Sequence, residues 1–132
     1  TRSFRVSRDP ESRGVSDKRA SASLLITFET NSAVLTAQAK QSLDVLASAL
    51  SSDNLASFRF AVYGHADPRG DSGANLLLSR LRAESVRQYL VHSKYIDGQR
   101  LEAIGKGDKE LLNLTDVTAP ENRRVTFVNL GR

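Results

Sequence analysis

The chain contains no cysteine, no methionine and no tryptophan among its 132 residues. The absence of cysteine excludes a disulfide framework, a thiol nucleophile and a cysteine-ligated zinc site. No segment approaches the roughly 18 apolar residues that a membrane-spanning helix needs, so we expect no direct membrane insertion by this segment. It carries no recognisable signal peptide and does not begin with methionine, which favours a mature chain or a domain excised from a longer protein.

The chain has a net charge of +4, and its positive charge is concentrated near the start. Residues 1–20 hold six arginines and lysines against three acidic residues, whereas the remainder is close to neutral. This first segment has few apolar residues and is interrupted by Pro10 and Gly14. We therefore expect a basic flexible linker over residues 1–21 and a folded domain over 22–132. The alternative is a basic arm that binds an anionic surface or nucleic acid.

Strand and helix patterns alternate after residue 21. Short apolar or alternating runs predict strands at residues 24–28, 58–63, 100–104 and 125–130. Two helical stripes lie between the first three strands, formed by Ala39, Leu43, Leu46 and Leu50 and then by Leu78, Leu81, either Ser85 or Val86, and Leu90. The β-α-β-α-β-β order predicts an α/β sandwich: a four-stranded mixed sheet with both helices on one face. The crossover connections favour parallel neighbours, with the last strand antiparallel.

The polar loop from Gly64 to Gly70 follows the second strand and holds candidate site residues. Pro68 biases Asp67 toward an extended backbone, so the carboxylate should project from the strand end. Arg82 borders the buried stripe of the second helix, where an arginine needs a partner. The spacing admits two interpretations. Asp67 and Arg82 either form a structural salt bridge, or bind a zwitterion such as the backbone end of an amino acid.

Other chemistries fit these residues poorly. His65 and Asp67 have no third ligand at a suitable spacing, so we expect no metal site. Ser79 falls within a helix and is not part of a nucleophile elbow, so we expect neither catalysis nor a cofactor. No aromatic platform with interleaved basic residues is present, which disfavours nucleic-acid binding by the folded core.

Four segments, in order, resemble the OmpA-like peptidoglycan-binding domain. Two of the four are adjacent: the run Gly64-His65-Ala66-Asp67-Pro68-Arg69-Gly70, and after it Asn75, Leu78-Ser79, Arg82-Ala83 and Val86. The form of the first is most similar to the Pal lipoprotein branch. Residues 28–32 resemble the end of the family's first strand, and residues 121–125 its Asn-Arg-Arg segment. The resemblance covers residues 22–130. Two departures are Arg69, where many members have threonine, and Glu29 in place of the usual aspartate.

The resemblance implies non-covalent binding of peptidoglycan through the meso-diaminopimelate of its stem peptide. Asp67 would hold the ammonium group and Arg82 the carboxylate. The other implied ligand-binding residues are Asn75, Arg69, Thr30 and Asn31, with His65, Asn122 and Arg123 in support. It further implies a periplasmic module, without cofactor or reaction, that anchors an outer-membrane or envelope protein of a Gram-negative cell to the wall. Alanine at Asp67 or Arg82 should then abolish binding with the fold intact.

The alternative to a wall anchor is an envelope protein-protein interaction domain. In that case the same fold would dock a partner protein, and Asp67 and Arg82 would form a structural pair.

Overall fold

The computed structural model describes residues 4–7, 21–24 and 26–132. Its elements are β1 (Phe4–Ser7), β2 (Ser21–Leu24), α1 (Ala37–Leu50), β3 (Arg59–Gly64), α2 (Ser72–His92), β4 (Leu101–Gly105) and β5 (Val125–Gly131), with short 3-10 helices at Gly98–Arg100 and Pro120–Asn122. In this described part, no helix combines the length and the apolar character needed to cross a membrane.

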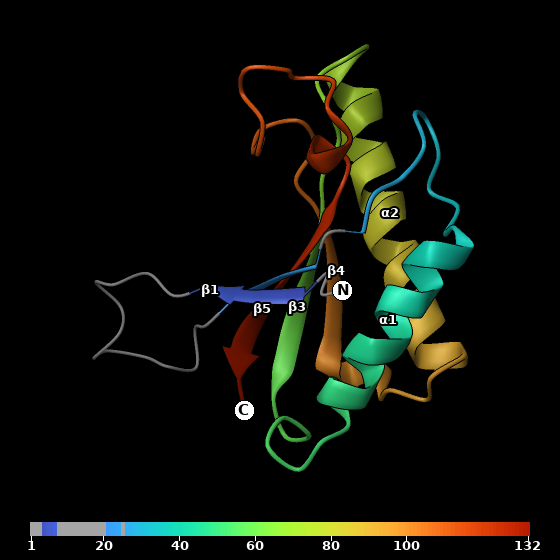
Figure 1. Cartoon of the computed structure of the whole chain (residues 1–132), viewed down its shortest axis with the longest axis vertical. Coiled ribbons are helices and arrows are strands. Elements are labelled where there is room, and N and C mark those ends of the chain that lie inside the picture. The colour runs from blue at the N-terminus through green and yellow to red at the C-terminus, as the bar shows by residue number, and fades with distance from the viewer. Residues whose placement is uncertain (1–3, 8–20, 25) are drawn as a thin grey trace.

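The strands form one mixed sheet in the order β1-β2-β5-β3-β4 (Figure 1). As expected, β3 and β4 are parallel neighbours joined through α2, and β5 pairs antiparallel with β3. Contrary to the expectation, β2 and β3 are not neighbours, because β5 lies between them. The expected count of four strands is wrong, because the described residues contain five. The additional strand, β1, lies in the segment predicted to be a linker and pairs antiparallel with β2. The rest of that prediction concerns residues 1–3 and 8–20, which lie outside the described residues.

The first predicted strand is displaced toward the N-terminus. Among the described residues of this segment, those that pair with β5 are Ser21–Leu24, and Leu24 lies opposite Val125, the first residue of β5. Ile26 and Phe28 then leave the ladder and bury their side chains in the core. Within the apolar run of residues 24–28, Ile26 and Phe28 therefore belong to the core and not to the sheet. Residues 29–32, which follow Phe28, then form a loop beside the end of β3.

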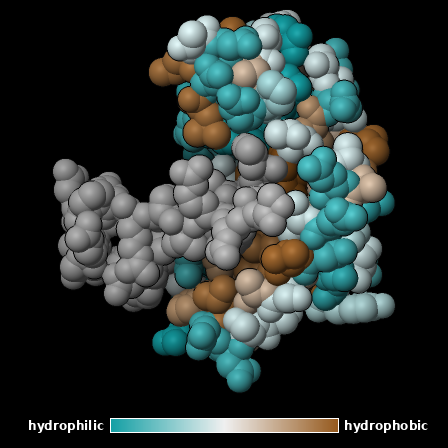
Figure 2. Space-filling view, in the orientation of Figure 1, coloured by the Kyte–Doolittle hydropathy of each residue, from teal (hydrophilic) through white to brown (hydrophobic). Residues whose placement is uncertain are grey.

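The two helices pack on one face of the sheet, as predicted (Figure 1). Each begins at a side-chain cap: Thr36 accepts a hydrogen bond from the amide of Ala39 (3.0 Å), and Asp71 accepts one from Ala74 (2.9 Å). The predicted stripe of α1 is confirmed, since all four of its residues are buried. The side chains on the outer side of the helices are mainly hydrophilic or neutral (Figure 2).

The buried face of α2 differs from its predicted stripe. Val86 and Leu90 are buried as expected, but Leu81 is 46% exposed. The face toward the sheet instead carries Ser79, Arg82 and Ala83 among its buried residues. Small residues are needed there because the helix backbone lies almost against the sheet. A Cβ atom at Gly105 would stand 2.7 Å from the amide nitrogen of Arg80, and one at Gly64 would collide with the carbonyl oxygen of Ser79.

We predict that Gly64→Ala lowers the free energy of unfolding by at least about 2 kcal/mol, because the new methyl group meets backbone that cannot turn aside. Chemical denaturation with circular dichroism measures the change. Gly73→Ala is the matched control: its Cβ would approach only a side-chain oxygen of Asp71, at 3.1 Å, and should change stability by less than about 1 kcal/mol. Equal stability of both variants and the wild type would contradict the close packing of α2.

Candidate functional site

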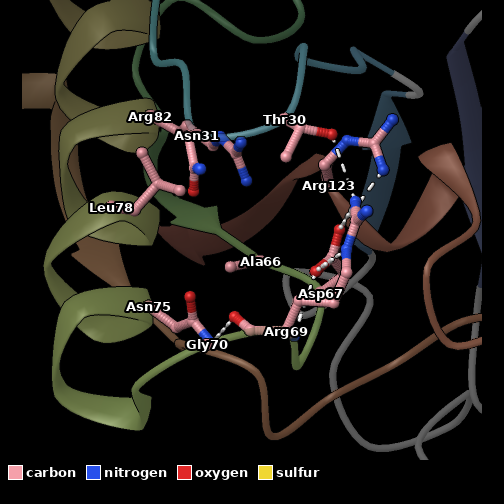
Figure 3. A pocket seen from close by; sticks show the side chains of 10 residues that line it. All are labelled: Thr30, Asn31, Ala66, Asp67, Arg69, Gly70, Asn75, Leu78, Arg82 and Arg123. Carbon is pink, nitrogen blue, oxygen red and sulfur yellow. Dashed lines mark hydrogen bonds and ion pairs between the residues drawn. The ribbon is translucent and has the colours of Figure 1, made fainter.

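A pocket of about 300 Å³ opens where the end of β3, the loop after Phe28, the start of α2 and the segment before β5 meet. Its lining residues are Thr30, Asn31, Ala66, Asp67, Arg69, Gly70, Asn75, Leu78, Arg82 and Arg123. In Figure 3, residues of α2 form one wall, while Asp67 stands opposite with the arginines that bind it. All six predicted ligand-binding residues therefore line one pocket.

The carboxylate of Asp67 is buried and held by two arginines. The Arg69 side chain binds it through two bonds, Nε to Oδ1 (3.1 Å) and Nη2 to Oδ2 (2.9 Å). The backbone amide of Arg69 donates to Oδ1 (3.1 Å), and Nη1 of Arg123 donates to Oδ2 (3.2 Å). Burial acts to raise the pKa of Asp67, but these hydrogen bonds outweigh it and lower the pKa to about 2. Asp67 is therefore ionised at any physiological pH.

The guanidinium of Arg82 is fully buried at the pocket, and its acceptors among the described residues are backbone carbonyls. Its Nε bonds to the carbonyl of Ser32 (2.8 Å), Nη2 to that of Glu29 (3.0 Å), and Nη1 to that of His65 (3.3 Å). The ring of Phe28 lies 5.1 Å from the guanidinium carbon. Burial lowers the pKa of Arg82 to about 10, with a further decrease from Arg123 that Asp67 opposes. Arg82 therefore remains a cation at neutral pH.

Asp67 and Arg82 are not paired with one another. Among the ion pairs of the described residues, Asp67 joins Arg69 and Arg123, and none joins Arg82. The structural salt bridge between these two residues, one of the two interpretations of their spacing, is therefore wrong. Arg82 instead ties α2 to the loop at residues 29–32 and to the end of β3. Because its removal would leave three carbonyls without their donor, the expectation that Arg82→Ala leaves the fold intact does not follow from this geometry.

Asn75 presents an amide to the pocket from the first turns of α2. Its Nδ2 donates to the carbonyl of Arg69 (2.8 Å) and to Oδ2 of Asp108 (3.1 Å). Both N–H groups are thus used, so the side-chain oxygen is the atom left for a ligand donor. Asp108 was missed by the sequence analysis because it lies 33 residues from Asn75 and no motif connects the two.

The loop residues Thr30 and Asn31 form the opposite rim. Oγ1 of Thr30 accepts a hydrogen bond from Nη2 of Arg69 (3.1 Å). Asn31 adopts a left-handed backbone conformation, with φ of 57°, which asparagine tolerates better than most residues.

Of the three predicted supporting residues, Arg123 lies nearest the site. It lines the pocket, contacts Asp67 directly, and is held by a bond from its Nε to the carbonyl of Phe28 (2.7 Å). Asn122 is buried behind it and organises the preceding loop: its Oδ1 accepts from the amides of Leu112 (2.7 Å) and Asn113 (2.9 Å).

His65 is buried at the end of β3 and contributes its backbone carbonyl to Arg82. Burial lowers the pKa of its ring to about 3, and the charges of Arg124 and Lys106 act in the same direction. The ring is therefore neutral at physiological pH. No group of three or more His, Asp or Glu side chains within the described ranges is placed to hold a metal ion.

The charged side chains lining the pocket are three arginines and one aspartate. Two of the arginines share Asp67, whereas the direct contacts of the Arg82 guanidinium within the described residues are backbone carbonyls and an aromatic ring. A buried cation without a carboxylate partner favours an anionic ligand group. The pocket also contains the carboxylate of Asp67, which binds cationic groups, and the side-chain oxygen of Asn75. The arrangement therefore suits a small ligand that carries both charges.

We predict that Arg82→Ala lowers the free energy of unfolding by about 2–4 kcal/mol, because three backbone carbonyls lose their donor. Arg80→Ala removes an exposed arginine from the same helix and should change it by no more than about 0.5 kcal/mol. Urea denaturation of both variants measures the difference. If the two variants unfold at the same urea concentration, Arg82 does not hold the loop to the helix.

The comparisons with known proteins agree with one another. The model of the OmpA family matches residues 27–125. Outer membrane protein A of Yersinia pseudotuberculosis is 40% identical over 93 residues, which cover 70% of this chain and 26% of that protein. Peptidoglycan-associated lipoprotein of Rhizobium meliloti is 34% identical over 105 residues, covering 78% of this chain and 58% of that protein.

The fold is also shared with a solved structure. The crystal structure of the peptidoglycan-associated lipoprotein from Burkholderia pseudomallei superposes with a TM-score of 0.69 at 27% identity, over 92% of this chain and 99% of that chain. This chain spans between a quarter and three fifths of the full length of the curated relatives it matches. With the family model matching most of its length and the pocket residues inside the matched region, the chain belongs to the OmpA family.

Proposed function

We propose that this domain binds peptidoglycan through the meso-diaminopimelate of the stem peptide, and so anchors an outer-membrane or envelope protein to the cell wall in the periplasm. Relatives named as peptidoglycan-associated lipoproteins support the peptidoglycan part of this proposal. The observation that carries the ligand assignment is the position of Arg82, a buried cation without a carboxylate partner that faces the same pocket as Asp67.

The free end of diaminopimelate carries an ammonium and a carboxylate on one carbon atom. A guanidinium has five N–H groups, and three of those of Arg82 are used by carbonyls. The remaining N–H on each terminal nitrogen binds the ligand carboxylate, forming the charge-assisted contact that Arg82 lacks within the described residues. Desolvation at this buried position strengthens the contact relative to one at an open surface.

The ammonium group binds on the other side of the pocket. Its acceptors are the carboxylate of Asp67 and the side-chain oxygen of Asn75. Thr30, Asn31 and Arg69 form the rim and surround the ligand where it enters. The pocket volume of about 300 Å³ suits the end of one side chain, so the rest of the stem peptide remains outside. Nothing in this binding mode requires a cofactor, and the domain performs no reaction.

The test is calorimetric titration with a muropeptide that contains meso-diaminopimelate and with one that contains lysine. Lysine has the ammonium group but no carboxylate at that end, so it cannot engage Arg82. We expect the diaminopimelate ligand to bind at least about tenfold more tightly, as for loss of one charged hydrogen-bonded contact. Equal affinity for the two ligands would contradict the role of Arg82, and binding of neither would contradict the proposed function.

The companion variant is Asp67→Asn, which keeps the shape of the side chain and removes its charge. We expect at least about tenfold weaker binding of the diaminopimelate muropeptide, because the ammonium loses its ionic partner. Asp53→Asn is the matched control, since it makes the same change at an exposed residue in the turn after α1. If Asp67→Asn binds as tightly as Asp53→Asn, the carboxylate is not part of the binding site.

A further inference from the structure

We infer that the side chain of Arg69 competes with the ligand's ammonium group for the carboxylate of Asp67, and must leave that carboxylate before the ligand binds. This inference rests on the proposed function, and it assigns to Arg69 a role in setting affinity and specificity.

The first observation is that Asp67 has no free acceptor in this structure. A carboxylate offers about four lone-pair sites. Oδ1 receives the backbone amide and Nε of Arg69, and Oδ2 receives Nη2 of Arg69 and Nη1 of Arg123. An ammonium group can therefore reach Asp67 only if one of these donors leaves.

The second observation is that Arg69 is the donor that can leave. Its side chain is 48% exposed, whereas that of Arg123 is 12% exposed. Arg123 is also held by the carbonyls of Phe28 and Thr118, at 2.7 and 3.0 Å. Apart from Asp67, the guanidinium of Arg69 hydrogen-bonds only to the hydroxyl of Thr30 among the described residues, and Asp116 adds a weaker attraction without a direct bond.

The third observation is that the backbone of Arg69 is fixed independently of its side chain. Its amide donates to Asp67 (3.1 Å), and its carbonyl accepts from Nδ2 of Asn75 (2.8 Å). Release therefore needs only a rotamer change of an exposed side chain, which is fast compared with loop movement. Figure 3 shows the guanidinium reaching from Asp67 toward Thr30 at the rim of the pocket.

The paired contact between Arg69 and Asp67 also affects which ligands can bind. Arg69 meets Asp67 through two parallel bonds, the arrangement that arginine forms with any carboxylate. The apparent affinity of a ligand is reduced by the fraction of protein in which this pair is closed. A ligand with an ammonium group gives the Asp67 carboxylate a new cationic partner in place of Arg69, whereas a ligand with a neutral amide does not. Arg69 thus weakens binding of the correct ligand while excluding uncharged ones.

The test is calorimetric titration of the Arg69→Gln variant with the meso-diaminopimelate muropeptide. An ion pair with one half-exposed partner corresponds to roughly two- to fivefold in an equilibrium constant, and we expect tighter binding by that factor. Arg80→Gln removes the same charge from an exposed position of α2 outside the pocket lining, and should bind as the wild type does. Unchanged or weaker binding by Arg69→Gln overturns the inference, and weaker binding would make Arg69 a direct ligand contact.

Two further measurements separate this inference from the proposed function. The double variant Asp67→Asn/Arg69→Gln should bind the muropeptide no more tightly than Asp67→Asn alone, because the gain in affinity acts through Asp67. NMR titration should show a higher pKa for Asp67 in Arg69→Gln than in the wild type, and an unchanged pKa would overturn the inference without any ligand. Binding by the wild type with no gain in Arg69→Gln refutes the competition alone. If neither protein binds the muropeptide, the proposed function and the inference fail together.

Discussion

The buried guanidinium of Arg82 is the contact on which the pocket depends. It ties three stretches of backbone that are distant in sequence: the loop containing Glu29 and Ser32, the end of β3 at His65, and α2 itself. Carbonyl oxygens satisfy its hydrogen-bonding groups only in part and do not neutralise its charge. The same residue therefore shapes the pocket and gives it a positive charge that favours an anionic group. In the proposed binding mode, the same side chain also binds the ligand carboxylate.

The position of Arg82 follows in turn from how closely α2 lies on the sheet. Glycines at the ends of β3 and β4 let the helix backbone approach within contact distance of the strands. Small helix residues, Ser79 and Ala83, face this contact. The long side chain of Arg82 can then pass the end of β3, where it binds the carbonyl of His65, and reach the loop at residues 29–32. Asp67 emerges a few residues after Gly64 on the other side, which separates the two charges across the pocket.

Much of this organisation could be predicted from the sequence, and the failures have physical causes. The stripe of α1 was predictable because its apolar side chains face an ordinary core. The outward position of Leu81 was not, because glycines far away in the chain decide which face of α2 touches the sheet. The motif placed Asp67 and Arg82 in one site. It did not reveal that Arg82 binds carbonyls, because backbone acceptors leave no trace in residue identity. The strand β1 was missed because its alternation, Phe4 and Val6 followed by Arg5 and Ser7, covers only four residues of a charged segment.

The most direct test of the account is a crystal structure of the domain with a meso-diaminopimelate muropeptide. The account predicts that the ligand carboxylate contacts the guanidinium of Arg82 and that the ammonium contacts Asp67. It also predicts that the side chain of Arg69 has turned away from that carboxylate. A ligand bound elsewhere on the surface, or one in this pocket with its carboxylate directed away from Arg82, would contradict the account.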